Sequence, residues 1–256
     1  DNSNREATID FTGTSLQQPN NFNAPSSVCM AAVLYVFRLL VDEDIPLNEG
    51  CLKPLKVIIP EGCMLAPTYP AAVVAGNVET SQTVTNAILG ALGILGASQG
   101  TMNNFTFGNE GAYQNYETIC GGSGAGPDFD GTDAVHTHMT NTRATDTEIL
   151  EWRFPVIVEA LSIRLNSGGR GAHKGGNGII RRVRFLEPMT AGITSSSRSC
   201  CPYGMAGGEP GKCGRNYVER NDGTVEELAG SDRADMEAGD VFVIETPGGG
   251  GYGSPE

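Results

Sequence analysis

The pattern of apolar and polar positions predicts two buried helices in the first part of the chain. The longest apolar stretch, Val28 to Val41, has 14 residues and contains Arg38. A bilayer span needs about 20 residues, so a buried helix over about 27–41 is expected, capped by Ser26 or Ser27. A second helix is predicted over 81–97, because Val84, Ile88, Ala91 and Leu95 fall on one stripe.

Three glycines interrupt the second predicted helix at regular spacing. Gly90, Gly93 and Gly96 recur every third residue. Each glycine costs roughly 1 kcal/mol of helix stability relative to alanine. We therefore expect another backbone or a ligand to approach this helix closely.

Strand patterns begin the chain and dominate its last hundred residues. Ala7, Ile9 and Phe11 alternate with polar residues, and 55–59 is a short apolar run between prolines. After a short helix opened by Thr145 to Glu148 and closed by Pro155, further strands are expected over 157–165, 182–185 and 240–245. The predicted class is α+β, with a helix-containing first half over about 1–155 and a mostly antiparallel β second half over 156–256.

Composition narrows the range of partners. The net charge of −13 argues against nucleic acid and anionic membranes, because both need a basic surface. Seven cysteines without a Cys-x-x-Cys pair or a secretory leader indicate reduced thiols and a cytoplasmic location. The chain opens directly on a strand and without methionine, which suggests that the natural polypeptide starts upstream.

Two phosphate-binding motifs fail on inspection. The tail Gly248 to Gly253 has the letters of a dinucleotide fingerprint, but the chain ends before the helix that must follow. A glycine-rich turn against another surface is the preferred interpretation. Gly211-Lys212-Cys213 resembles the end of a P-loop but departs from it at two positions. Ala206 stands where the upstream glycine is required, and Cys213 stands where Ser or Thr is required. We expect no ATP binding by these residues.

The most promising polar cluster surrounds two of the three histidines. On an extended strand His136 and His138 would face one side, about 6–7 Å apart. Three interpretations remain open: structural hydrogen bonding, an active-site role, and a metal site that would need a third ligand. Asn141, Arg143 and Glu148 follow closely, either as site residues or as loop and helix-cap residues.

A basic, glycine-rich loop is the second candidate. Six cations and no acid lie between residues 164 and 184: Arg164, Arg170, Lys174, Arg181, Arg182 and Arg184. Within this stretch the loop 167–178 could converge its amides on an anion, with Arg170 and Lys174 adding charge. A solvated hairpin explains the same residues equally well.

The order of motifs resembles one known family. The run 101–109 (TMNNFTFGN) is followed by the Gly121 to Gly126 loop, VHTHMTNTRATDTEILE at 135–151 and SGGRGAHKGGNG at 167–178. Pro202-Tyr203-Gly204 and the glycine tail come last. This series is similar to the second half of the hydantoinase B region of 5-oxoprolinases, N-methylhydantoinases and acetone-type carboxylases. NFNAPSSV, DIPLNEGCLKP and GNVETSQ, earlier in the chain, look most like the 5-oxoprolinase branch.

The resemblance implies an ATP-dependent amidohydrolase that converts 5-oxo-L-proline to L-glutamate. In that scheme ATP and Mg²⁺ are held by a hydantoinase A-like ATPase half or subunit, which phosphorylates the lactam oxygen, and the B region opens the ring. The whole chain, 1–256, would be the C-terminal portion of a B-type domain, inactive alone. Alternatives are a piece of an N-methylhydantoinase or acetone-type carboxylase subunit, or a structural and assembly module.

The resemblance also sets the site expectations. The candidates for catalysis are His136, His138, Asn141 and Arg143. Those for binding substrate are Arg170, Lys174 and Asn103, and any metal site would lie upstream, with no cofactor expected in this segment. We expect a homo-oligomer that acts on a small molecule.

Overall fold

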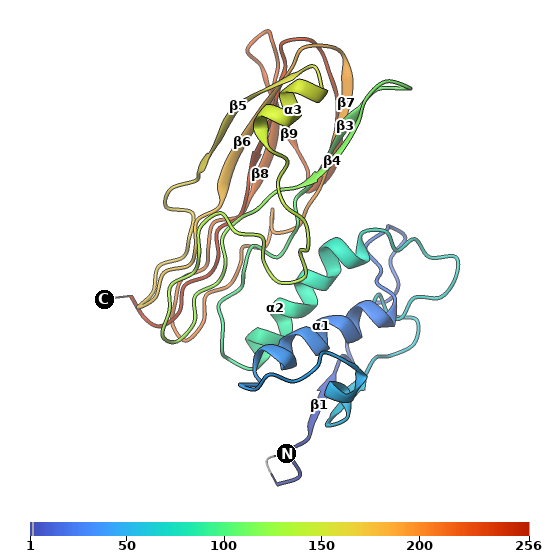
Figure 1. The fold of residues 1–256 in the computed structure, drawn as a ribbon, viewed down its shortest axis with the longest axis vertical. Helices are drawn as coiled ribbons and strands as arrows, with labels where there is room; N and C mark the ends of the chain where they lie inside the picture. The colour runs from blue at the N-terminus through green and yellow to red at the C-terminus, as the bar shows by residue number, and fades with distance from the viewer. Residues whose placement is uncertain (2, 256) are drawn as a thin grey trace. The chain divides into compact units, whose positions relative to one another are not determined.

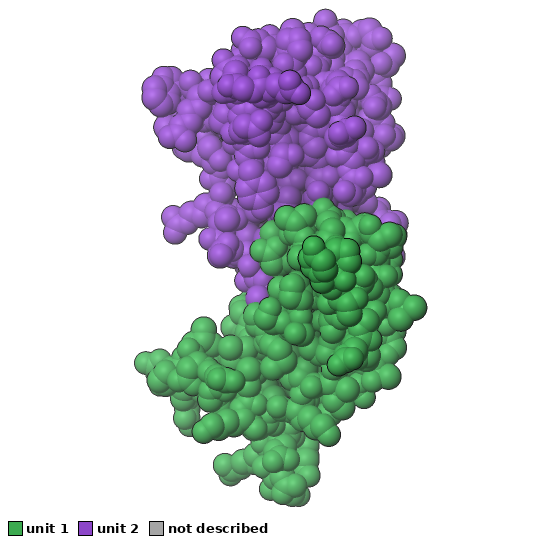
Figure 2. Space-filling model, turned by 90° about the vertical axis from the view of Figure 1, so that its right-hand side faces the viewer, with its two compact units in different colours: residues 1–88 green, residues 89–256 purple. Residues whose placement is uncertain are grey.

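The computed structural model describes residues 1 and 3–255 and divides into two compact units, 1–88 and 89–256 (Figure 2). The few helices and mostly antiparallel sheets confirm the α+β class. The change to mainly β structure at about residue 156 falls inside the second unit.

The first unit contains the two expected strands and the first helix. Strands β1 (Ala7–Asp10) and β2 (Leu55–Ile58) pair in parallel. Helix α1 (Ser26–Leu39) follows Pro25 without a side-chain cap, so the prediction of a serine cap was wrong. Its buried residues, Cys29, Ala32, Val33 and Val36, have the spacing of one helix face. Two short helical turns, η1 (Glu49–Leu52) and η2 (Gly76–Thr80), complete this part.

Helix α2 (Ser81–Ala91) ends six residues before the predicted boundary at 97. Gly93 adopts a left-handed φ of 70°, its N–H donates to the Gly90 carbonyl, and the Ile94 N–H donates to the Leu89 carbonyl. This is the Schellman arrangement that ends helices. The other two glycines do permit close approach: a Cβ on Gly90 would lie 2.4 Å from the Tyr203 hydroxyl, and one on Gly96 would lie 2.6 Å from the Gly250 carbonyl.

Two antiparallel sheets form a sandwich in the second unit (Figure 1). The four-stranded sheet has the order β10-β7-β3-β4, with β3 (Asn104–Gly108), β4 (Gln114–Thr118), β7 (Met189–Thr194) and β10 (Ser231–Met236). The five-stranded sheet has the order β5-β6-β11-β8-β9, with β5 (Val156–Ile163), β6 (Ile179–Phe185), β8 (Arg215–Glu219), β9 (Val225–Leu228) and β11 (Val241–Glu245).

Apolar side chains of both sheets meet in one core. On β6, Val183 and Phe185 point inward and Arg182 and Arg184 point outward, as their alternation predicts, while Arg181 is buried on the inward face. Phe105 on β3 and Phe242 on β11 pack across the layers, with ring centroids 4.9 Å apart and ring planes tilted by 42°. The sandwich is therefore held by direct packing between its two inner faces.

Helix α3 (Thr147–Arg153) precedes the five-stranded sheet. Its N-cap is Asp146, whose carboxylate accepts from the Glu148 and Ile149 amides, so the predicted cap at Thr145 was off by one residue. The next strand, β5, has a bulge between Val158 and Ala160. Glu159 lies on the outer side of the sheet, where it pairs with Arg182 and Arg184. The apolar residues that predicted this strand, Ile157, Leu161 and Ile163, are also exposed.

The glycine-rich segments form an extended bundle at the end of the second unit that carries the C-terminus (Figure 1). The tail is its central strand. Gly248 and Gly251 donate to carbonyls of 209–212, Gly249 and Tyr252 to carbonyls of 173–176, and Gly250 to Ala97. Successive residues thus face three different neighbours, which is a three-residue period, whereas a β-strand has a period of two.

This packing explains why the tail consists of glycine. A Cβ on Gly249 would lie 1.9 Å from the Ser123 carbonyl oxygen, and one on Gly250 would lie 1.8 Å from that of Tyr203. Only glycine fits so close to neighbouring backbones, as at the axis of collagen. The tail is an extended bundle core, so the interpretation of a glycine-rich turn was wrong.

The cysteines differ from expectation in one respect. Cys201 and Cys213 are joined by a disulfide, whereas Cys29, Cys51, Cys63, Cys120 and Cys200 are free. The expectation that all seven thiols are reduced was therefore wrong for one pair.

Among the described residues, no helix is long and apolar enough to cross a bilayer.

Candidate functional site

The two histidines lie in a loop, so the prediction of an extended strand was wrong. Val135 makes a single bridge to Gly121, and the chain then turns at 138–139. Ala134 and His138 adopt left-handed φ values of 50° and 48°. Such values are uncommon outside glycine and are concentrated at functional sites. The period-two argument that aimed both rings to one side no longer applies.

The beginning of this loop is fixed to the glycine bundle. The Asp133 carboxylate accepts from the Asn177 backbone N–H at 2.6 Å and from its Nδ2 at 3.2 Å. The Ala134 N–H donates to the Asn177 carbonyl. These three bonds tie the histidine loop to the closely packed backbones of the bundle and hold its first residues in one conformation.

Burial keeps both imidazoles neutral at pH 7. It lowers the pKa of His138 from 6.5 to about 4 and lowers that of His136 as well. The buried Nδ1 of His136 has no hydrogen-bond partner within the described ranges. A neutral imidazole can accept a proton or donate one hydrogen bond, but it cannot supply positive charge.

Asn141 and Arg143 lie on the same loop and are exposed to solvent. Between them, the Thr142 hydroxyl is hydrogen-bonded to that of Thr118 on β4. The structure therefore places all four predicted catalytic residues on one loop: His136 and His138 are half-buried, and Asn141 and Arg143 are exposed. Glu148 lies in the first turn of α3, which agrees with the helix-cap interpretation.

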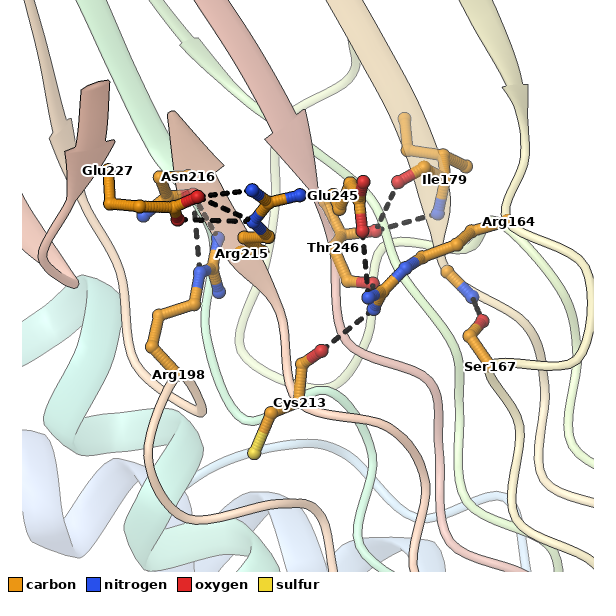
Figure 3. Close-up of polar contacts among 11 residues, drawn as sticks. Arg164, Ser167, Ile179, Arg198, Cys213, Arg215, Asn216, Glu227, Glu245 and Thr246 are labelled. Carbon is orange, nitrogen blue, oxygen red and sulfur yellow. Dashed lines mark hydrogen bonds and ion pairs between the residues drawn. The ribbon is translucent and has the colours of Figure 1, made fainter. Parts of the chain in front are cut away.

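Asn103 belongs to a buried polar network that the sequence did not reveal (Figure 3 shows its Arg198 and Asn216). Its Nδ2 donates to Gln99 Oε1 at 2.8 Å and to the Ile119 carbonyl at 3.0 Å, and its Oδ1 accepts from Arg198 at 2.8 Å. Arg198 also donates to Asn216 Oδ1 at 2.8 Å. Asn103 itself is wholly buried with a left-handed φ of 45°, so its amide is fixed inside the protein and does not face solvent.

Arg170 and Lys174 are exposed on the bundle surface. Arg170 makes a bidentate pair with Glu209. The surrounding amides are occupied: Gly169 donates to Gly249, Gly175 to Gly169, Gly176 to Ser123 and Lys174 to the Asp130 carboxylate. The loop 167–178 does connect the antiparallel strands β5 and β6, as the hairpin interpretation expected. Its backbone is part of the bundle and is not solvated, and the occupied amides do not form an anion nest.

The six cations of this stretch are largely neutralised by acids from elsewhere. Arg164 pairs with Glu245 at 2.8 Å and also donates to the Cys213 carbonyl (Figure 3). The remaining pairs are Arg170 with Glu209, Arg181 with Glu117, Arg182 with Glu159 and Glu219, and Arg184 with Glu159. The stretch is thus a set of ion pairs and not a basic surface.

The pattern of apolar and polar positions did not predict the burial of some further polar residues. In the first unit, Glu79 on η2 and Gln82 on α2 are wholly buried. The only sequence feature that drew attention to these two residues was the motif GNVETSQ, which resembles the family. In the described part of the chain, no three His, Cys, Asp or Glu side chains converge as metal ligands.

Comparison with known proteins gives a consistent result. The family model described as "Hydantoinase B/oxoprolinase" matches residues 1–255. The chain is 50% identical to 5-oxoprolinase 1 of Arabidopsis thaliana over 97% of its own length and 20% of that protein, and 46% identical to the 5-oxoprolinase of Dictyostelium discoideum over 100% and 20%. It spans about a fifth of the length of these relatives.

Two solved structures are similar in fold. The ATP-dependent caprolactamase from Pseudomonas jessenii has a TM-score of 0.82 at 21% identity, with 97% of this chain and 46% of that chain covered. The nucleotide-free acetone carboxylase has a TM-score of 0.82 at 16% identity, with 96% and 39% covered.

Proposed function

Because this chain belongs to the hydantoinase B/oxoprolinase family, we propose that it is part of an ATP-dependent 5-oxoprolinase and contributes to opening the lactam ring. The observation that carries the proposal is the 50% identity to a 5-oxoprolinase over nearly the whole chain. A D-/L-hydantoinase component from a Pseudomonas species is only 28% identical over a similar span. The 5-oxoprolinase branch is therefore favoured over the hydantoinase branch.

The proposed reaction explains a requirement for ATP. An unstrained lactam is a poor electrophile, and phosphorylation of its oxygen would provide a better leaving group. ATP and Mg²⁺ would be held by a hydantoinase A-like ATPase half or subunit, in keeping with relatives about five times as long as this chain. A caprolactamase, whose name also indicates a lactam, shares the fold.

Within this chain the histidine loop is the proposed contribution to ring opening. His138, neutral because burial holds its pKa at about 4, can accept a proton from an attacking water but cannot act as a cationic acid at pH 7. The Nδ1 of His136 has no partner in the described residues but is enclosed by protein atoms, so a reacting group would reach it only if the loop opens. Arg143 and Asn141 can donate to a carboxylate or oxyanion.

Asn103 is better suited to supporting the site than to binding substrate. Both hydrogens of its amide are used by Gln99 and Ile119, and its oxygen accepts from Arg198. We therefore propose that it positions Arg198. A cytoplasmic location and a homo-oligomeric assembly stay predictions.

The test uses the full-length enzyme and two matched variants. His138→Ala should lower turnover of 5-oxoproline by about 10²-fold, as loss of a positioned proton acceptor does, with ATP binding preserved. His173→Ala is the control, since His173 faces Asp130 on the bundle and should keep near-normal turnover. Equal effects of the two variants, or normal turnover of His138→Ala, would return His138 to a structural role.

A further inference from the structure

The outer face of the four-stranded sheet carries a groove of about 560 Å³. It is lined mainly by outward-facing residues of the four strands and by the β3–β4 turn: Thr106, Gln114, Tyr116, Thr190, Gly192 and Arg233 among them. Its volume lies within the range of small-molecule sites, which is about 300–1,000 Å³. All of its lining residues belong to the second unit.

Strand register sets the order of side chains across the groove. Arg233 on β10 is paired with Gly192 on β7, Gly192 with Thr106 on β3, and Thr106 with Tyr116 on β4. At about 4.8 Å between strands this row is about 14 Å wide. A cation thus stands at one edge and an aromatic ring, 53% exposed, at the other, with a hollow between them.

The hollow exists because Gly192 has no side chain, although the fold does not require glycine there. Gly192 is absent from the glycines with left-handed φ. A Cβ would meet nothing nearer than the Thr106 hydroxyl oxygen at 3.3 Å, whereas one on Gly108 would lie 2.2 Å from the Tyr113 carbonyl. Glycine within a strand costs roughly 0.5–1 kcal/mol relative to alanine. A glycine inside a strand marks a bulge, a bend, or a place where a ligand or another backbone comes close. The pairing of β7 with β10 and β3 runs through Gly192 without a register shift, which leaves close approach as the reason.

Arg233 differs from the outward arginines of the other sheet. Arg182, Arg184 and Arg215 each pair with a glutamate. Arg233 is exposed, and in the described ranges no carboxylate oxygen lies within 4 Å of its guanidinium. The nearby acids are engaged elsewhere, since the Asp235 carboxylate accepts from Thr190 and that of Asp232 from the Ala229 amide.

We propose that this groove binds a small planar organic carboxylate. Its carboxylate pairs with Arg233, its body lies over Gly192, and its plane contacts the Tyr116 ring. Guanidinium groups hold carboxylates in bidentate geometry, and aromatic side chains favour flat apolar partners. Glu110, also in the lining, disfavours a second negative charge at the turn end of the groove. This site is separate from the histidine loop and does not depend on the proposed reaction.

The test measures binding of benzoate to the full-length protein by saturation-transfer difference NMR, with neutral benzamide as the matched ligand. Benzoate should bind with a Kd on the order of 1 mM and at least tenfold more tightly than benzamide. Arg233→Gln should weaken binding at least tenfold, whereas Arg184→Gln on the other sheet should not change it.

Gly192→Ala separates binding from folding. It should weaken benzoate binding at least tenfold while the midpoint of thermal unfolding is unchanged or raised. The proposal is overturned if benzoate and benzamide bind equally, if neither binds at 20-fold the expected Kd, or if Gly192→Ala keeps full affinity. Binding of an acidic peptide but not of benzoate would also overturn it, in favour of a protein partner.

Discussion

Two ion pairs in the second unit have the same chemistry and opposite burial. In each, an arginine donates through Nε and Nη2 to the two oxygens of a glutamate: Arg181 to Glu117 at 3.1 and 3.2 Å, and Arg170 to Glu209 at 3.0 and 2.8 Å. The side chains of the first pair are 0% and 1% exposed, and those of the second are 73% and 45% exposed. Burial is therefore the main variable when one carboxylate is neutralised.

We predict that Glu117→Gln destabilises the protein by about 3–5 kcal/mol, because it leaves the Arg181 charge buried and uncompensated. One of the Arg181 donors, Nη1, already has no partner in the described residues, so the guanidinium cannot readily be satisfied elsewhere. Glu209→Gln should destabilise the protein far less than Glu117→Gln, because water screens and solvates the exposed pair.

Urea unfolding followed by far-ultraviolet circular dichroism checks this prediction. With a slope of about 3 kcal/mol per molar urea, the Glu117→Gln midpoint should fall by about 1–1.7 M, whereas the Glu209→Gln midpoint should stay close to that of the unchanged protein. The double variant Glu117→Leu with Arg181→Met should recover much of the loss, since it removes both charges. Equal shifts for the two glutamine variants would refute the reasoning from burial.

Three further outcomes are expected. Gly249→Ala should destabilise the protein by more than about 3 kcal/mol or prevent folding, because its Cβ would lie 1.9 Å from the Ser123 carbonyl oxygen. The thermal unfolding midpoint of this variant should fall well below that of Gly192→Ala, the control. Burial lowers the folded-state pKa of His138 from 6.5 to about 4, so its contribution to stability is complete above pH 6.5 and is lost as the pH falls toward 4. The free energy of unfolding of His138→Asn, measured between pH 4 and 6.5, should therefore depend less on pH than that of the unchanged protein. Alkylation in denaturant, followed by mass spectrometry, should label five cysteines before reduction and all seven after it, because Cys201 and Cys213 are bonded.

Local pattern was enough to predict most of the secondary structure. An apolar run of helical period predicts α1, and strict alternation predicts the inward Val183 and Phe185 of β6. These features depend on neighbours a few residues apart, so sequence spacing alone contains the information. The predicted end of α2 failed because Gly93 could be a helical residue or a left-handed stop, and only its hydrogen bonds decide.

The candidate site was predicted less completely. The sequence identified the histidine loop, but the orientation of His136 and His138 required a strand that does not form. Arg198 was not singled out, because nothing near it in the chain indicates that Asn103, 95 residues away, accepts its hydrogen bond. The assignment of the histidine loop to the site stays a prediction.

By itself the sequence determined the α+β class, the inward positions of Val183 and Phe185 on β6, and membership in a family through the order of its motifs. The tertiary structure decided what the glycines and the charges do. Gly248 to Gly253 occupy the centre of a bundle, and the arginines between residues 164 and 184 meet glutamates from distant strands. The physical reason is that both roles depend on which backbones and charges come within a few ångströms in space, and chain spacing does not encode those partners.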